Sequence, residues 1–190
     1  MMKSILILLI ILLALIVKCS ATTVAYDGRN LACDSRITTN YKVGNEWKPC
    51  KIKDDAIKYK CVSNIIFCCS GNIYKFDWFI LNYLQKLLVE HPDDPCNNIY
   101  NVPHLDFDLE DLEIMVIHKA KPGVVDIWPA SVDTNKGTAI MTPPVVIGSG
   151  GPYAISAMKQ GCTAAESVEF AENKDLYSGG PIQGGGVPPF

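Results

Sequence analysis

The sequence predicts one α+β domain that follows a short apolar leader. Several short apolar runs, rich in β-branched residues, are bounded by turn residues, as expected for strands. The stretches 73–90 and 152–159 instead repeat apolar residues every three or four positions, as expected for amphipathic helices. The strands flank and separate these helices, so both helical layers can cover a sheet. This order favours α+β layering over a doubly wound parallel sheet.

Size and composition narrow the functional classes. The chain has 190 residues, of which 48% are hydrophobic, so it can bury a sizeable core as one domain. A net charge of -3 predicts no nucleic-acid partner. The eight cysteines form no Cys-x-x-Cys pair and the three histidines are scattered, so we expect no metal site and no cofactor.

Residues 1–21 have the pattern of a secretory signal peptide. A lysine precedes the uninterrupted apolar run 5–17, and Cys19 and Ala21 occupy the small-residue positions before a cleavage site. The run is short for a membrane span. We therefore expect a secreted, lumenal or periplasmic protein whose mature chain begins at Thr22. The alternative is an uncleaved signal anchor that tethers the protein to a membrane.

A β-hairpin is predicted directly after the leader. The pair Asp27-Gly28 favours a two-residue type I′ turn, in which both central residues need positive φ. This turn pairs Thr22 with Cys33 and places Asp34 one step beyond Thr22. A threonine at a new N-terminus, with a carboxylate beside it, is a candidate nucleophile.

The segment after this hairpin divides into a polar and an apolar part. Residues 37–56 are polar and rich in turn residues, so we expect a surface excursion with a small hairpin around Gly44-Asn45. The run 65–71 is apolar, contains β-branched residues and ends at Gly71, which predicts a buried strand.

The middle of the chain begins with the amphipathic helix over 73–90, which should stop before the proline at position 92. The acidic segment 91–112 contains prolines and is expected to be a surface loop. Two strands, 113–119 and 124–128, follow. Residues 129–144 show no regular pattern.

The last part of the chain begins with a short strand over 145–147 that runs into a glycine-rich turn. Helical spacing follows until Gly161 interrupts it, and a capping-box pattern at Thr163 opens a further helix to about residue 173. The remainder is expected to hold a short strand within 175–181 and a Gly/Pro-rich tail over 184–190.

Three separated segments carry a family resemblance. Thr22-Thr23-Val24-Ala25, followed by Asp34-Ser35-Arg36, resembles the start of a mature proteasome β-type subunit. Ile147-Gly148-Ser149-Gly150-Gly151-Pro152-Tyr153-Ala154 looks like the matching segment of the bacterial HslV-type peptidase. Asp175-Leu176-Tyr177-Ser178-Gly179-Gly180 is similar to the late Asp-x-Tyr-Ser-Gly-Gly motif of proteasome catalytic subunits. The segments occur in the family's order, and the resemblance covers residues 22–183.

This resemblance implies the N-terminal-nucleophile (Ntn) hydrolase fold, a four-layer αββα sandwich, and a threonine peptidase. Thr22 is then the nucleophile, and Thr23 is the competing choice. A threonine hydroxyl is weakly nucleophilic and needs a base. The free α-amine of an N-terminal threonine, with a pKa near about 8, can serve directly or through one water.

The resemblance also implies the remaining site residues. Asp34 would pair with a catalytic lysine, for which we choose Lys58, while the nearby Lys51, Lys53 and Lys60 remain alternatives. Gly71 would donate a backbone N–H to the oxyanion. The outer members of the site would be Ser149, Asp175 and Ser178.

We therefore expect a secreted or lumenal threonine hydrolase that acts on peptides or unfolded protein. The family's peptidases normally work in cytosolic rings fed by ATP-driven unfoldases, so the leader departs from the family pattern. We expect unassisted action, and whether the chain forms a homo-oligomeric ring stays open. The alternatives are a catalytically inactive proteasome-like scaffold or binding subunit, tethered by an uncleaved anchor, and a small-molecule amidase on the same fold.

Overall fold

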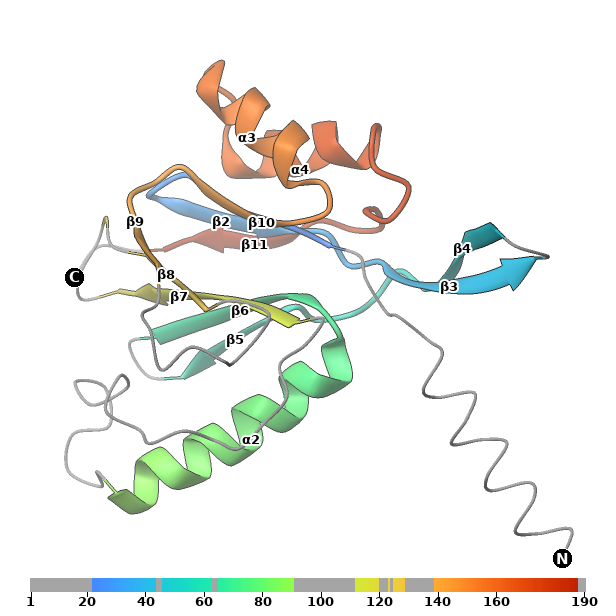
Figure 1. Ribbon diagram of the computed structural model, residues 1–190. Helices are drawn as coiled ribbons and strands as arrows, with labels where there is room; N and C mark the ends of the chain where they lie inside the picture. Colours follow the sequence, from blue (N-terminus) through green and yellow to red (C-terminus); the bar gives the residue numbers. More distant parts are fainter. Residues whose placement is uncertain are drawn as a thin grey trace, which may run out of the picture.

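The computed structural model describes residues 22–43, 46–62, 65–90, 112–119, 123, 125–128 and 139–187. In these residues a four-stranded and a five-stranded antiparallel sheet lie face to face, and helices cover both outer faces (Figure 1). The layers therefore run helix, sheet, sheet, helix. This arrangement confirms the predicted α+β class and the four-layer αββα sandwich.

The four-stranded sheet has the strand order β10-β1-β2-β11. Its strands are β1 (Thr23–Tyr26), β2 (Asn30–Cys33), β10 (Val145–Gly148) and β11 (Gln183–Gly186). Alternate side chains of β1 and β2 point to opposite faces, as the strand period requires. Val24 and Leu31 pack against the other sheet, whereas Ala25 and Ala32 pack under α3 (Gly151–Lys159) and α4 (Ala164–Glu172).

The five-stranded sheet follows the chain in the order β5-β6-β7-β8-β9. Its strands are β5 (Tyr59–Val62), β6 (Ile65–Gly71), β7 (Leu112–His118), β8 (Val125–Trp128) and β9 (Ala139–Met141). The helix α2 (Ile73–Glu90) covers its outer face. Both faces of β6 are buried because Phe67 packs against α2 while Ile66 packs against the other sheet.

The strands β3 (Ile37–Val43) and β4 (Glu46–Lys53) form an antiparallel hairpin that projects from the sandwich (Figure 1). This confirms the hairpin predicted around Gly44-Asn45, although these two residues lie outside the described part. The predicted helix over 73–90 is likewise confirmed as α2.

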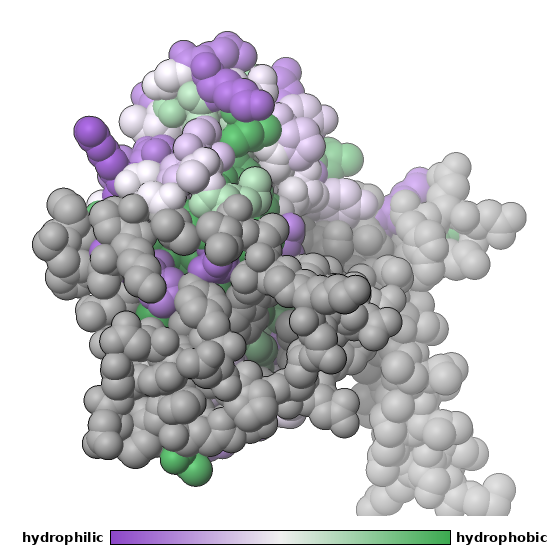
Figure 2. All heavy atoms as spheres, turned by 60° about the vertical axis from the view of Figure 1, so that its left-hand side comes forward, coloured by the Kyte–Doolittle hydropathy of each residue, from purple (hydrophilic) through white to green (hydrophobic). Residues whose placement is uncertain are grey.

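The capping box predicted at Thr163 is present. The Thr163 hydroxyl accepts a hydrogen bond from the backbone N–H of Glu166, and the Glu166 carboxylate accepts one from the backbone N–H of Thr163. The two N–H groups at the start of α4 are thereby satisfied. Exposed charged side chains such as Lys159 and Glu169 lie on α3 and α4, and Figure 2 shows hydrophilic residues gathered over this top layer.

The register predicted for the first hairpin is wrong. Val24 lies opposite Cys33 and Tyr26 opposite Leu31, so four residues separate the last pair instead of the two that were predicted. The Asp27 carboxylate accepts hydrogen bonds from the backbone N–H groups of the residues two and three positions ahead. This side chain organises a wider loop than a type I′ turn, because Asp side chains compete for local backbone donors.

The end of the chain also differs from the prediction. No strand forms within residues 175–181, which are turns and irregular backbone. Instead β11 pairs with β2, and this strand crosses the predicted start of the tail at residue 184. A Cβ at Gly184 would lie 2.0 Å from the Leu31 carbonyl oxygen, so glycine permits this close pairing. The strand β9 falls in the segment for which no regular pattern was predicted.

Two predicted segments lie outside the described residues, namely the leader over 1–21 and nearly all of the loop over 91–112. Among the residues that the structure describes, none of the helices has the length and apolar character needed to cross a membrane.

Replacement of Phe76 by alanine tests the packing of α2 on the five-stranded sheet. Phe76 has no exposed surface, so Phe76→Ala should lower the free energy of unfolding by about 3–5 kcal/mol through lost burial and a residual cavity. Urea denaturation measures this change. Tyr74→Ala, on the exposed side of the same helix, should change it by no more than about 0.5 kcal/mol. Similar small losses for both variants would contradict the packing.

Candidate active site

Six of the predicted site residues lie just beyond the ends of strands and helices. Thr22 precedes β1, Asp34 follows β2, and Lys58 precedes β5. Ser149 lies in the turn between β10 and α3, and the loop after α4 carries Asp175 and Ser178. Their side chains form two hydrogen-bonded groups, described in turn below.

The first group is centred on the amino group of Lys58. Lys58 Nζ donates to Thr22 Oγ1 at 2.5 Å, to Asp34 Oδ1 at 3.1 Å and to the backbone carbonyl of Arg36 at 2.5 Å. A lysine ammonium has three N–H donors, and three acceptors surround this one. Lys58 is only 2% exposed, so its contact with Thr22 lies in a site largely shielded from water.

The structure distinguishes Lys58 from its neighbours in the sequence. Lys53 pairs with Asp55 and Lys60 pairs with Asp77, and all four of these side chains are substantially exposed. The side chain of Lys51 lies outside the described part of the structure. Among the lysines whose side chains are described here, Lys58 is therefore the one directed at Thr22.

The buried carboxylate of Asp34 connects several segments. Oδ1 accepts from the backbone N–H of Thr23 at 2.8 Å as well as from Lys58. Oδ2 accepts from the backbone N–H groups of Gly179 at 3.0 Å and Arg36 at 3.3 Å. The observed hairpin register makes this arrangement possible, because it places Asp34 opposite Thr23 rather than beyond Thr22.

The second group is centred on Asp175. Asp175 Oδ2 accepts from Ser149 Oγ at 2.6 Å and from Ser178 Oγ at 2.7 Å. Ser178 Oγ is also hydrogen-bonded to Thr23 Oγ1 at 2.7 Å. The two consecutive threonines thus belong to different groups. The hydroxyl of Thr22 faces the lysine and that of Thr23 faces the serine, which favours Thr22 as the candidate nucleophile.

Two glycines allow the backbone to approach these threonines closely. Gly148 has a φ of +97°, and a Cβ there would lie 1.9 Å from the Thr22 carbonyl oxygen. A Cβ at Gly150 would lie 1.9 Å from Thr23 Oγ1. Any side chain at either position would collide with the start of β1, so the Gly-Ser-Gly-Gly turn can present Ser149 here only with glycine on both sides.

Gly71, the predicted oxyanion donor, lies at the end of β6 with a φ of +105°. Cys69, two residues earlier on the same strand, donates a backbone hydrogen bond to the Lys58 carbonyl, so β6 runs beside the first group. The contacts of the described residues do not join Gly71 itself to Thr22. Its role in stabilising an oxyanion stays a prediction.

Arg36 has a structural role that the sequence did not indicate. Its Nη1 donates to the Ser178 carbonyl at 2.8 Å and its Nε to Asp54 Oδ1 at 3.0 Å. A Cβ at Gly179 would lie 2.3 Å from the Arg36 guanidinium carbon. Arg36 therefore holds the Ser178-Gly179 backbone against the site. The only available signal was its place in the Asp34-Ser35-Arg36 motif.

The buried cysteines beside the site are poor nucleophile candidates. Burial, together with the nearby charge of Asp34, raises the pKa of the Cys33 thiol to about 12. Burial also raises the pKa of Cys68 and Cys69 well above the ordinary value. Because the thiolate is the reactive form, these thiols are inert near neutral pH. Within the described residues, no group of three or more His, Cys, Asp or Glu side chains could hold a metal ion.

A search of solved structures finds proteins of similar fold. The fold is similar to that of eukaryotic HslV from Trypanosoma brucei. The TM-score is 0.51 at 17% sequence identity, over 87% of this chain and 97% of that chain. BPH from Thiobacillus denitrificans matches at 18% identity with a TM-score of 0.46, over 87% of this chain and 96% of that chain.

A second structure of that protein, in complex with epoxomicin, matches at 17% identity with a TM-score of 0.46, over 87% of this chain and 96% of that chain. No protein-family model matches the sequence, and no curated protein matches it. The similarity to HslV, at 17% identity, establishes the fold alone.

Glu172, at the end of α4, lies close to the charges of the first group. Its pKa is raised to about 7, mainly by burial and also by the negative charges of Asp34, Glu169 and Asp54, against a lowering effect of Arg36. Its Oε1 is buried and has no hydrogen-bond partner among the described residues. An ionised Glu172 is therefore unfavourable in the folded protein.

Glu172→Gln should stabilise the protein at pH 8 and leave its stability at pH 4 unchanged. With a folded-state pKa of about 7 against an ordinary value of 4.5, the folded chain keeps a proton that the unfolded chain loses, so stability falls as pH rises between these values. Solvent screening of this half-exposed side chain limits the gain to about 1 kcal/mol. Urea denaturation at both pH values measures it. A pH-independent effect of Glu172→Gln would contradict this assignment.

Proposed function

We propose that the protein is a threonine-type N-terminal-nucleophile hydrolase that cleaves peptide (amide) bonds, with Thr22 as its nucleophile. The observation that carries the proposal is the 2.5 Å contact between Thr22 Oγ1 and the buried Lys58 Nζ. The fold, similar to that of HslV, supports the same chemistry. One fold can host many functions, so the proposal depends mainly on the contact between Thr22 and Lys58.

The proposed reaction begins with the removal of residues 1–21, which converts the Thr22 nitrogen from an amide into a free α-amine. Thr22 Oγ1 then forms a bond with the substrate carbonyl carbon, and its proton moves to this amine. When the carbon–nitrogen bond of the substrate breaks, the amine returns the proton to the leaving nitrogen. Water finally hydrolyses the acyl-enzyme ester and restores the threonine hydroxyl.

The positive charge of Lys58 serves two purposes in this reaction. It stabilises negative charge that develops on the oxygens of the reacting centre in a site with little water. It also disfavours protonation of the adjacent α-amine, which keeps that amine available as a base. Asp34 holds Lys58 in place, and Gly71 is assigned as the backbone donor to the oxyanion.

The second hydrogen-bonded group is assigned a positioning role. Asp175 holds the hydroxyls of Ser149 and Ser178, and Ser178 in turn holds the Thr23 side chain. Because Thr23 is joined covalently to Thr22, this group fixes the start of β1 relative to Lys58. Correct orientation of a reacting group can supply a large share of a rate enhancement.

We further propose that the leader directs the protein into a secretory or periplasmic compartment and is cleaved there. The same cleavage would activate the enzyme, since it releases the Thr22 amine. Its substrates would be peptides or unfolded protein. A homo-oligomeric ring is proposed by analogy with the resembled family.

Hydrolysis measurements on the chain that begins at Thr22 test the proposed function. Fluorogenic peptide amides should be cleaved, Thr22→Ala should abolish cleavage, and Lys58→Ala should lower kcat by about 10²- to 10³-fold through loss of charge stabilisation. Lys53→Ala is the matched control, because it removes an exposed lysine of the same segment and should leave kcat unchanged.

Full activity of Thr22→Ala or of Lys58→Ala would contradict the proposed roles. Cleavage of small-molecule amides without cleavage of peptides would replace the peptidase with an amidase. Inertness of the correctly processed chain toward both substrate classes would favour a catalytically inactive scaffold.

A further inference from the structure

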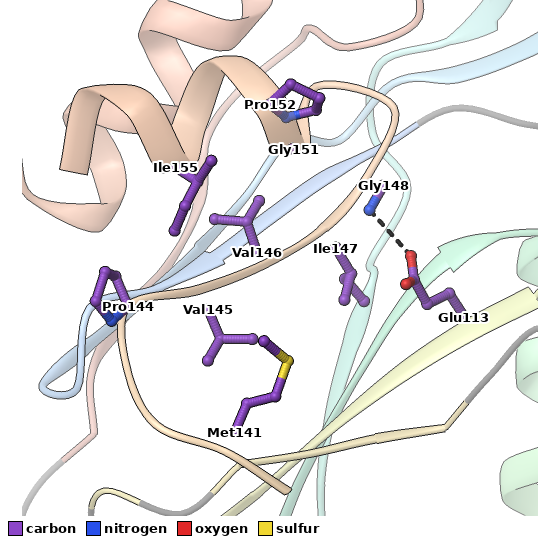
Figure 3. A pocket seen from close by; sticks show the side chains of 10 residues that line it. All are labelled: Glu113, Met141, Pro144, Val145, Val146, Ile147, Gly148, Gly151, Pro152 and Ile155. Carbon is purple, nitrogen blue, oxygen red and sulfur yellow. Dashed lines mark hydrogen bonds between the residues drawn. The ribbon is translucent and has the colours of Figure 1, made fainter. Parts of the chain in front are cut away.

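A cavity of about 350 Å³ lies beside the candidate active site, along β10 at the edge of the four-stranded sheet (Figure 3). Apolar side chains of β10 and α3 form most of its wall, among them Val146 and Ile155, and Met141 contributes from β9. Glu113 of β7 is the one charged side chain among the ten residues that line it. The cavity is therefore apolar with a single carboxylate.

Gly148 connects this cavity with the candidate active site. Its backbone N–H donates to Glu113 Oε2 at 3.1 Å, as Figure 3 shows. Its α-carbon lies against the Thr22 carbonyl, because a Cβ added there would be 1.9 Å from that oxygen. The next residue is Ser149, which belongs to the group around Asp175. Gly148 alone thus separates a ligand that contacts Glu113 from Thr22 in the first group and from Ser149 in the second.

The chemistry of Glu113 indicates what such a ligand should carry. The hydrogen bond to Gly148 occupies one carboxylate oxygen, and a carboxylate has a second oxygen that can accept further bonds. Burial raises the pKa of Glu113, although the Gly148 N–H partly offsets this effect. A partly buried carboxylate is stabilised by an opposite charge, because desolvation otherwise penalises its ionised form.

We propose that this cavity is a substrate subsite for a side chain with an apolar stem and a cationic end, such as lysine or arginine, whose cation pairs with Glu113. The volume lies at the low end of the range for ligand pockets, about 300–1,000 Å³, so it suits one side chain rather than a longer peptide segment. This inference rests on the proposed function, since it names the class of substrate residue that the site would select.

Binding of simple amines tests the subsite without hydrolysis. n-Hexylamine, which is cationic at neutral pH, should bind about tenfold or more tightly than the neutral 1-hexanol, because only the ammonium pairs with a carboxylate. Titrations followed by ligand-observed NMR on the chain that begins at Thr22 give both affinities. Glu113→Gln keeps the size of the side chain and an acceptor for Gly148 but should remove the preference for the amine.

Glu169→Gln is the matched control, since it removes one exposed carboxylate on α4 and should leave the preference intact. Ile155→Trp provides a second test from another element, because a larger side chain on the cavity wall should abolish binding of both probes. Equal affinities for the two probes in the unaltered protein, a preference that survives Glu113→Gln, or unimpaired binding by Ile155→Trp would overturn the subsite.

Peptide hydrolysis separates this inference from the proposed function. Paired peptides with lysine or norleucine next to the cleaved bond should differ in KM, and Glu113→Gln should remove the difference. If neither peptide is cleaved but hexylamine binds through Glu113, the proposed function fails, while the cavity remains a binding site for an apolar side chain with a cationic end. If both are cleaved equally and the amine shows no preference, the subsite fails and the proposed function stands.

Discussion

The buried carboxylate of Asp34 is the interaction on which the rest of the site depends. It accepts hydrogen bonds from Thr23, Lys58, Gly179 and Arg36, which belong to four different segments of the chain. An unpaired charge at this depth would be strongly destabilising, so the buried carboxylate needs these donors. The carboxylate in turn fixes the positions of the donors. The position of Lys58 next to Thr22 follows from this mutual arrangement.

Local sequence patterns predicted the elements well where side chains determine them. The helix α2 was predicted from its apolar period and the start of α4 from its capping box, because each signal depends on residues close together in the chain. The register of the first hairpin was predicted wrongly. The Asp27 side chain accepts hydrogen bonds from backbone N–H groups that a type I′ turn would leave available for strand pairing. The strand β11 was missed because glycines carry no side-chain pattern.

The candidate site was only partly readable from the sequence. The resemblance brought together Thr22, Asp34 and Asp175 and favoured Lys58 as the lysine. It left the neighbouring lysines as alternatives, because only the folded chain shows which lysine side chain is directed at Thr22. Arg36 and Glu113 act through contacts with segments far away in the sequence. No local pattern marks such contacts, because they exist only once the two sheets and the loop after α4 have packed together.

The state of the Thr22 nitrogen tests the central claim most directly, because the proposed base exists only if residues 1–21 are removed. Protein from the cells that naturally produce it would be unfolded and treated with periodate, which cleaves a 1,2-amino alcohol with a free amine, and then with an aminooxy tag. Intact-mass and peptide analysis should find a chain that begins at Thr22 and carries the tag there. A chain that retains the leader, or that begins elsewhere and leaves Thr22 untagged, would contradict the account.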